Sequence, residues 1–193
     1  MRHKPVNPLR KGEWMVDTIS LHQAVEIVTR LHYAKGASNT AVFRHGLFRK
    51  EQWPLWVSGA AIWIPPTKGA AIATSDGDWQ RVLSLSRLVI EEGVPTNGAS
   101  FLLSQSVKMI RASGDWDVLV TYADEWRGHT GAIYKACGWE YRGLTASLPT
   151  YVINGKLTAR KSGPKTRTHS EMMELGAEMV GKHAKHKFVK VLR

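Results

Sequence analysis

Two side chains in the sequence could handle a proton or an anion within a sheet. Asp124 follows the apolar run Asp117–Tyr122, and the carboxyl end of a buried strand is where α/β sheets place ligand sites. A carboxylate there predicts a general base, with a cap for the helix expected from His129 as the alternative. Arg87 lies among the apolar residues of Val82–Ile90, where a buried charge must be paired. It predicts a contact to an anion or a phosphate near the centre of the sheet.

Other candidates stand at the ends of expected helices. Ser100 could act in a site, or its hydroxyl could only satisfy the backbone of a first helical turn. His129 could orient a substrate or only cap a helix. His32 and Tyr33 close the first expected helix, where a histidine commonly interacts with the helix dipole. From the residues alone, both interpretations stay open at each position.

Two strand–loop–helix units must position these side chains. The first has a strand over Val82–Ile90 and a helix over Ala99–Ala112. The second has a strand over Asp117–Tyr122, a helix over His129–Ala136 and then a strand over Gly138–Gly143. Upstream, the apolar patterns predict a helix capped by Ser20 over Leu21–Leu31 and strands over Ala41–Phe48 and Trp53–Ile64. Alternating strands and helices imply a parallel pair, so we expect an α/β or α+β fold around a mixed sheet.

Composition limits the class of protein. The chain has 193 residues, 43% hydrophobic and 22% charged, which suits one domain and excludes disorder, collagen and coiled coil. No apolar stretch approaches the roughly 20 residues of a membrane span, and the basic start has no apolar segment behind it. The lone Cys137 fits a reducing compartment. We therefore expect a cytoplasmic protein that has no membrane partner.

The charge of the chain is concentrated at its ends. Residues 13–154 hold as many basic as acidic side chains, so the net charge of +11 comes from residues 1–12 and 155–193. We expect a single domain (1–193) with a basic N-terminal arm (1–12) and a basic C-terminal appendage (155–193). Such ends predict a polyanionic partner, most often nucleic acid, with a solvated basic surface as the alternative.

One motif resembles a known fold. The run from Tyr134 to Trp139, a helix followed at once by a strand, is similar to the last conserved helix–strand step of the GCN5-related N-acetyltransferase (GNAT) fold. In that superfamily, backbone N–H groups at the start of a preceding helix hold the pyrophosphate of an acyl-CoA. The tyrosine matching Tyr134 often protonates the leaving thiolate there, although a packed aromatic residue would fit the sequence equally well.

The loop that matches the pyrophosphate site departs from the GNAT pattern. Val94 stands in place of the usual Gln or Arg, Asn97 replaces the first glycine, and Pro95 has no N–H to donate. We therefore expect acyl-CoA to bind poorly and leave the group donor unidentified. The cofactor contacts that the resemblance implies fall on Asn97, Gly98, Ala99 and Ser100.

A narrower resemblance runs from about residue 30 to the C-terminus. Six short motifs occur in the order found in the Mom family of phage DNA-modification proteins: Leu31–Tyr33, Leu85–Leu88, Asn97–Ser100, Tyr122–Asp124, Gly128–Tyr134 and Tyr151–Lys156. The resemblance implies a diverged GNAT domain that adds a carbamoylmethyl group to adenine N6 and so protects DNA from host restriction. It also implies catalytic roles for Asp124, Tyr134, Arg87 and Ser100, and an iron ion held by His32, Tyr33 and Tyr134.

Three functions remain open at this stage. The first is modification of DNA adenine in the host cytoplasm, by a monomer or a homodimer. The others are acetyl-CoA-dependent acetylation of a protein or small amine, which Cys137-Gly138 favours, and DNA binding without catalysis. Tryptophans could stack on an extruded base or fill the core: Trp53, Trp56, Trp63, Trp126 and Trp139.

Overall fold

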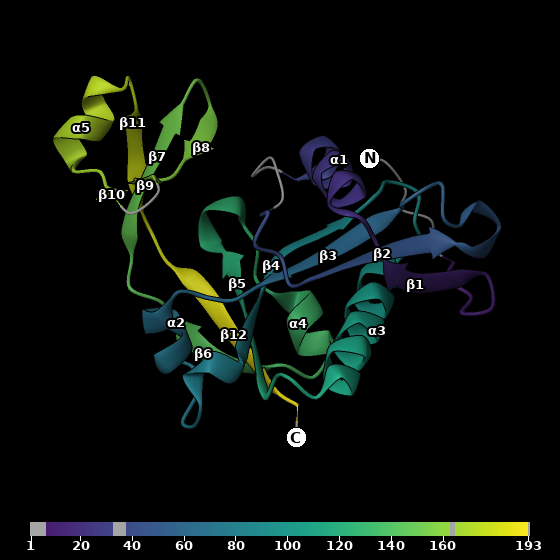
Figure 1. Cartoon of the computed structure of the whole chain (residues 1–193). Coiled ribbons are helices and arrows are strands. Elements are labelled where there is room, and N and C mark those ends of the chain that lie inside the picture. Colours follow the sequence, from purple (N-terminus) through teal and green to yellow (C-terminus); the bar gives the residue numbers. More distant parts are fainter. Residues whose placement is uncertain (1–6, 33–37, 163–164, 193) are drawn as a thin grey trace.

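A seven-stranded sheet crosses the molecule in the order β1-β2-β3-β4-β5-β12-β6 (Figure 1). The computed structural model describes residues 7–32, 38–162 and 165–192. All neighbours in this sheet are antiparallel except β4 and β5, which are parallel. The strands are β1 (Trp14–Thr18), β2 (Phe43–Arg49), β3 (Gly59–Ile64), β4 (Val82–Ile90), β5 (Val118–Asp124), β6 (Glu140–Leu144) and β12 (Lys185–Val191). The expected mixed sheet is confirmed.

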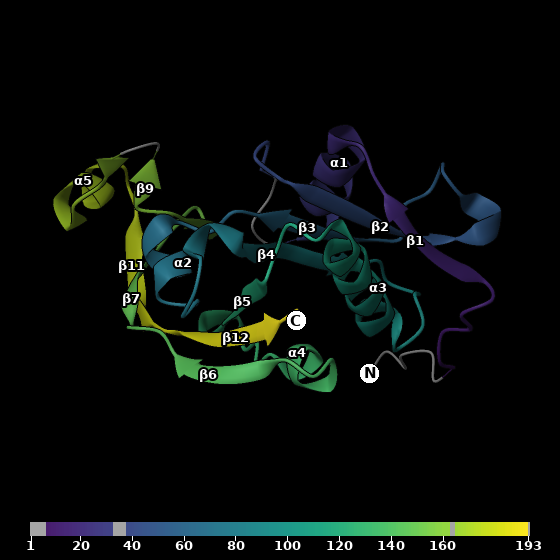
Figure 2. The ribbon, with the colours of Figure 1, turned by 60° about the horizontal axis from the view of Figure 1, so that its bottom comes forward.

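Two helices cover opposite faces of the sheet (Figure 2). α1 (Leu21–Leu31) is capped by Ser20, and α3 (Gly98–Ser113) crosses the other face. Side chains of β3 alternate between the two cores: Ala60 and Ile62 pack in the cluster with α1, and Ala61 and Trp63 in the cluster with α3. The shorter helices are α2 (Lys68–Ile72), α4 (Ala132–Ala136) and α5 (His169–Glu174), with 3-10 turns η1 (Lys50–Gln52), η2 (Trp79–Arg81) and η3 (Glu125–Arg127). None of the helices in the described ranges is both long and apolar enough to cross a bilayer.

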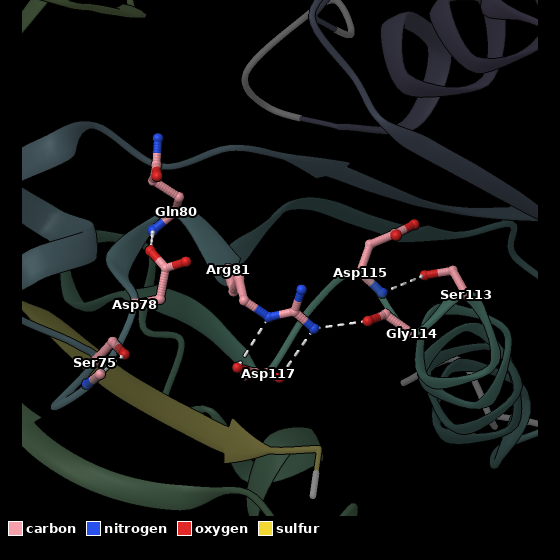
Figure 3. A network of polar contacts seen from close by, with 9 residues as sticks. Ser75, Asp78, Gln80, Arg81, Ser113, Gly114, Asp115 and Asp117 are labelled. Atoms are coloured by element: carbon pink, nitrogen blue, oxygen red, sulfur yellow. Dashed lines mark hydrogen bonds and ion pairs between the residues drawn. The ribbon is translucent and has the colours of Figure 1, made fainter.

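The parallel strands β4 and β5 are held together at one end and separate at the other. They pair only from Val82–Val118 to Leu85–Thr121. Just before this ladder, Arg81 Nε and Nη2 donate to the two carboxylate oxygens of Asp117, at 3.0 and 3.2 Å (Figure 3). Beyond Leu85 the two strands no longer pair, so an opening forms in the middle of the sheet.

A second unit is inserted between β6 and β12. We call residues 145–184 the insertion lobe. It holds a three-stranded sheet in the order β11-β7-β8, a two-stranded pair β10-β9 and α5, around a small core of its own. Both views show it standing apart from the body, beyond the end of β5 (Figures 1 and 2). Its strands are β7 (Leu148–Ile153), β8 (Lys156–Thr158), β9 (Lys161–Ser162), β10 (Lys165–Thr166) and β11 (Glu178–His183).

The basic stretch 155–193 is therefore not one appendage. Residues 155–184 belong to the insertion lobe, but β12 is an interior strand that pairs with both β5 and β6. Phe188 and Val189 are buried on opposite faces of the sheet, which is why lysines on either side of them do not form a free tail.

Two expected elements differ most from their predicted bounds. The strand predicted over Trp53–Ile64 begins only at Gly59, since residues 53–57 form a loop in which Pro54 has no N–H for a ladder. The helix predicted from His129 begins at Ala132, because Gly131 has a left-handed φ of +70° that ends the preceding loop. Strand β1 adds a further edge to the sheet.

Candidate functional site

The opening between β4 and β5 is the mouth of a cavity of about 480 Å³. Its walls come from the separated ends of both strands, the start of α3 and the loop between β5 and α4. This is the crevice where α/β sheets bind ligands. The lining residues are His32, Leu85–Leu88, Ile90, Ala99, Thr121–Ala123 and Gly128–Tyr134.

A β-bulge sets the direction of Arg87. Ile62 pairs with Arg87 and Trp63 with Leu85, so Ser86 is the extra residue of β4. Ser86 Oγ donates to the Ile62 carbonyl at 3.1 Å, and Arg87 Nη1 donates to the Ser86 carbonyl at 2.7 Å. Arg87 is among the residues that line the cavity, and its role as an anion contact stays a prediction.

Tyr134 forms the opposite wall. Its ring packs against Trp139 and Phe188, with centroids 5.8 and 5.3 Å apart. Burial raises the pKa of the Tyr134 phenol, and a hydrogen bond with Thr121 partly opposes that shift. The phenol is therefore protonated at neutral pH and can donate a proton. Thr121 also donates from Oγ1 to the Leu85 carbonyl at 3.3 Å, where the parallel ladder ends. In the sequence, Thr121 stands out because it is a hydroxyl residue within the apolar run of β5.

Asp124 lies at the end of β5 but is not among the residues that line the cavity. It is buried, and Lys185 Nζ lies 3.7 Å from its Oδ2. Its backbone carbonyl accepts the N–H of His129 at 3.2 Å, which fixes the start of the cavity loop. His129 itself lines the cavity. The structure thus brings Arg87, His129 and Tyr134 together around one space, with Asp124 behind it.

The start of α3 does not fit an acyl-CoA pyrophosphate. The Gly98 N–H donates to the Pro95 carbonyl at 2.8 Å and the Val94 N–H to Glu91, so these groups are used within the loop. A Cβ on Gly98 would lie 2.3 Å from Val94 Cγ1, so the space beside this glycine is filled by a side chain. A phosphate cradle needs both free N–H groups and that space. The reaction proposed for this protein therefore does not use acyl-CoA.

The consecutive residues Asn97–Ser100, predicted to contact a cofactor, make different contacts in the structure. Ala99 lines the cavity. Asn97 Oδ1 accepts the backbone N–H of Leu9, which anchors the N-terminal segment. Ser100 Oγ donates to the Asn97 carbonyl at 2.9 Å, as a residue that satisfies the first turn of a helix would.

The structure describes two of the three iron ligands that the family resemblance implies. His32 and Tyr134 line the same cavity, and Tyr33 lies outside the described residues. Across residues 7–32, 38–162 and 165–192, no three His, Cys, Asp or Glu side chains gather closely enough to hold a metal. Two of the three implied ligands are tyrosines, which lie outside this set of donors, so the iron site stays a prediction and the proposed reaction does not depend on it.

The tryptophans divide between core and surface. Trp63 and Trp139 are buried in the α3 core, whereas Trp53 and Trp56 are exposed on the loop before β3. Trp126 alone of the five lies on η3, which leads directly into the cavity loop. Its ring centroid is 6.3 Å from that of His183.

Several solved structures with a similar architecture are N-acetyltransferases. NAA60 of Arabidopsis thaliana, in complex with a bisubstrate analogue, has a TM-score of 0.59 at 12% identity over 92% of this chain and 97% of that one. An N-acetyltransferase from Staphylococcus aureus Mu50 gives 0.55 at 13% over 93% and 99%. The ribosomal-protein-S18-alanine N-acetyltransferase of Escherichia coli gives 0.52 at 12% over 93% and 94%. At these identities the likeness shows the fold, so the chain has a GNAT fold.

The family is identified from a match that spans both the large sheet and the insertion lobe. The model of the Mom protein family matches residues 13–193. The chain therefore belongs to the Mom family, as its motifs indicated. No curated protein sequence matches it.

Proposed function

We propose that the protein transfers a small group to the exocyclic N6 of adenine in DNA, in a reaction of the carbamoylmethylation type that protects phage DNA from restriction. The observation that carries this proposal is the cavity in the split sheet. Arg87, His129 and Tyr134 line it together, and its described lining residues include no Asp or Glu. Membership of the Mom family supports DNA as the substrate.

The low reactivity of the adenine N6 amine gives each of these side chains a role in the proposed reaction. The N6 lone pair is delocalised into the ring, so the amine is a weak nucleophile that needs a base. N6 attacks the donor carbon; the new N–C bond forms while the bond from that carbon to its leaving group breaks. His129 accepts the N6 proton, the negative charge of Asp124 stabilises the imidazolium that forms, and the protonated Tyr134 gives its proton to the leaving group. Arg87 stabilises negative charge on the donor.

The size of the cavity supports an extruded base. N6 is engaged in Watson–Crick pairing, so adenine must be flipped out or met in single-stranded DNA. The volume of about 480 Å³ lies within the range of roughly 300–1,000 Å³ typical of ligand pockets. Base and donor group would share this one space.

Mass spectrometry of nucleosides tests the proposal directly. The full chain is expressed in a bacterial host, the cellular DNA is digested, and adenine adducts are compared with those from cells that carry the empty vector. We expect a new deoxyadenosine adduct. Unmodified deoxyadenosine, together with acetylation of protein or of small amines, would instead identify a conventional acetyltransferase.

A further inference from the structure

The most concentrated positive charge in the described part of the lobe lies on the pair β9–β10. We call Arg160, Lys161, Lys165 and Arg167, with the two strands that they flank, the basic ribbon. Lys161 pairs with Thr166 and Lys165 with Ser162. The same register continues to Arg160 and Arg167, because the Arg167 N–H donates to the Arg160 carbonyl at 2.9 Å.

Two arginines therefore face each other across the base of the ribbon. Arg160 Nε donates to the Arg167 carbonyl at 2.8 Å, which holds the Arg160 side chain against the opposite strand. Like charges directly opposite on paired strands are destabilising. Each strand is only two residues long, and an isolated pair of strands is marginally stable in water. The ribbon thus keeps positive charges close together, although their repulsion destabilises the free protein.

Only one side of the ribbon is neutralised by the protein. Lys165 forms an ion pair with Glu171 of α5, and Glu174 lies on the same surface beside Arg167. Lys161 is exposed, and residues 13–154 have no net negative charge to offset it. A polyanion is the partner that this arrangement fits.

The lobe is joined to the body next to the cavity. The Ala184 N–H donates to Glu125 Oε2 at 3.2 Å, and the rings of His183 and Trp126 are in contact. Glu125 and Trp126 belong to η3, which is followed immediately by cavity residue Gly128. The junction of the lobe with the body thus lies next to the loop that lines the cavity.

We infer that the basic ribbon binds the phosphate backbone of DNA and so holds the duplex over the cavity. This inference rests on the proposed function for the identity of the polyanion. The major groove of duplex DNA is wide enough for a two-stranded ribbon, which lets cations on both strands reach phosphates. The contact is to the backbone, so it strengthens binding to every sequence alike.

Fluorescence anisotropy with a 20-base-pair labelled duplex over a range of salt concentrations tests the inference on the full chain. The triple variant R160Q/K161Q/R167Q should bind more weakly and lose about 2 to 3 from the slope of log K against log salt, since each phosphate contact contributes about 0.9. The matched control K50Q/K68Q/K108Q removes three exposed body lysines and should keep the wild-type slope. If the triple variant does not fold, K161Q alone should lower the slope by about 0.9.

Adduct formation is measured on the same proteins to separate the two proposals. An unchanged slope in the ribbon variant, with wild-type adduct levels, would overturn the ribbon as a DNA contact and leave the proposed function standing. A reduced slope in the ribbon variant, together with no adduct from the wild-type protein, would support the ribbon and remove the adenine chemistry. Binding of polyglutamate through the ribbon, without binding of DNA, would make it a protein contact and overturn the inference.

Discussion

His45 Nδ1 and Ser106 Oγ lie 2.7 Å apart in the core between the sheet and α3. Trp63 Nε1 also donates to Ser106 Oγ at 2.7 Å. Because an indole N–H can only donate, the hydroxyl accepts from Trp63 and can give its own hydrogen to His45 Nδ1. That arrangement requires the neutral imidazole. Burial lowers the pKa of His45 to about 4, and the charge of Asp17 opposes the shift.

The first prediction is that the protein loses stability in mild acid because of His45. Its folded pKa lies below the ordinary value of 6.5, so the unfolded chain binds the proton more readily. Its contribution is therefore fully present above pH 6.5 and is lost as the pH falls toward 4. Between pH 7.5 and pH 5, we expect a loss of about 2 kcal/mol in the free energy of unfolding, measured with urea.

The variant His45→Gln provides the control for this pH dependence. It keeps an acceptor for Ser106 but removes the titrating group. The free energy of unfolding of His45→Gln should change much less than that of the wild type over the same interval. An equal loss in both proteins would assign the acid sensitivity to other groups.

The second prediction concerns the glycine at the start of α4. Gly131 has a φ of +70°, and an added Cβ would lie 2.1 Å from a ring carbon of Phe188. Gly131→Ala combines a left-handed L-residue, about 1–2 kcal/mol, with overpacking of about 1–3 kcal/mol, so we expect a loss of about 2–5 kcal/mol. Gly128 has the same conformation, φ +69°, and a Cβ added there would meet no atom within 4 Å. Gly128→Ala should cost only the first part, and thermal unfolding of both variants measures the difference.

The third prediction separates chemistry from folding. Tyr134→Phe removes the cavity phenol and keeps its packing against Trp139 and Phe188, so adduct formation should fall about 100-fold or more while the melting temperature changes little. Asp124→Asn should reduce adducts in the same way. Tyr141→Phe is the control: Tyr141 bonds His186 at 3.0 Å on the surface of the sheet, outside the cavity. Wild-type adduct levels in Tyr134→Phe would remove the phenol from the reaction.

The central part of the fold was predictable because its local and tertiary signals agree. β4 and β5 are apolar runs, and α3 has apolar residues at helical spacing on one face. Their connection as a parallel pair follows from a helix between two strands. Arg87 is unusual in such a run, and this is why the cavity wall could be expected from the sequence.

The insertion lobe and β12 could not be predicted in the same way. β9 and β10 have two residues each, too few to show any periodicity. β12 reads as a basic tail, because its buried Phe188 and Val189 stand between lysines. Their burial depends on pairing with β5, which lies about sixty residues earlier in the chain, and no local pattern reports that contact. Asp124 was placed at the right strand end, but its distance from the cavity depends on side-chain packing.

The fourth prediction distinguishes the lysines of β12 from those of the lobe. Lys190 Nζ donates to the carbonyls of Cys137 and Gly138, both at 3.1 Å, where α4 ends. A cation that satisfies terminal carbonyls stabilises a helix, and hydrogen bonds to charged groups contribute about 1.5–3 kcal/mol. Lys190→Met should therefore lower the free energy of unfolding by about 1–2 kcal/mol after allowance for its partial exposure, with little change in DNA affinity. Lys182→Met, on the exposed surface of β11, should leave the unfolding free energy within about 0.5 kcal/mol of the wild type. A large loss of DNA affinity in Lys190→Met, with unchanged stability, would contradict the capping role and indicate that Lys190 contacts DNA.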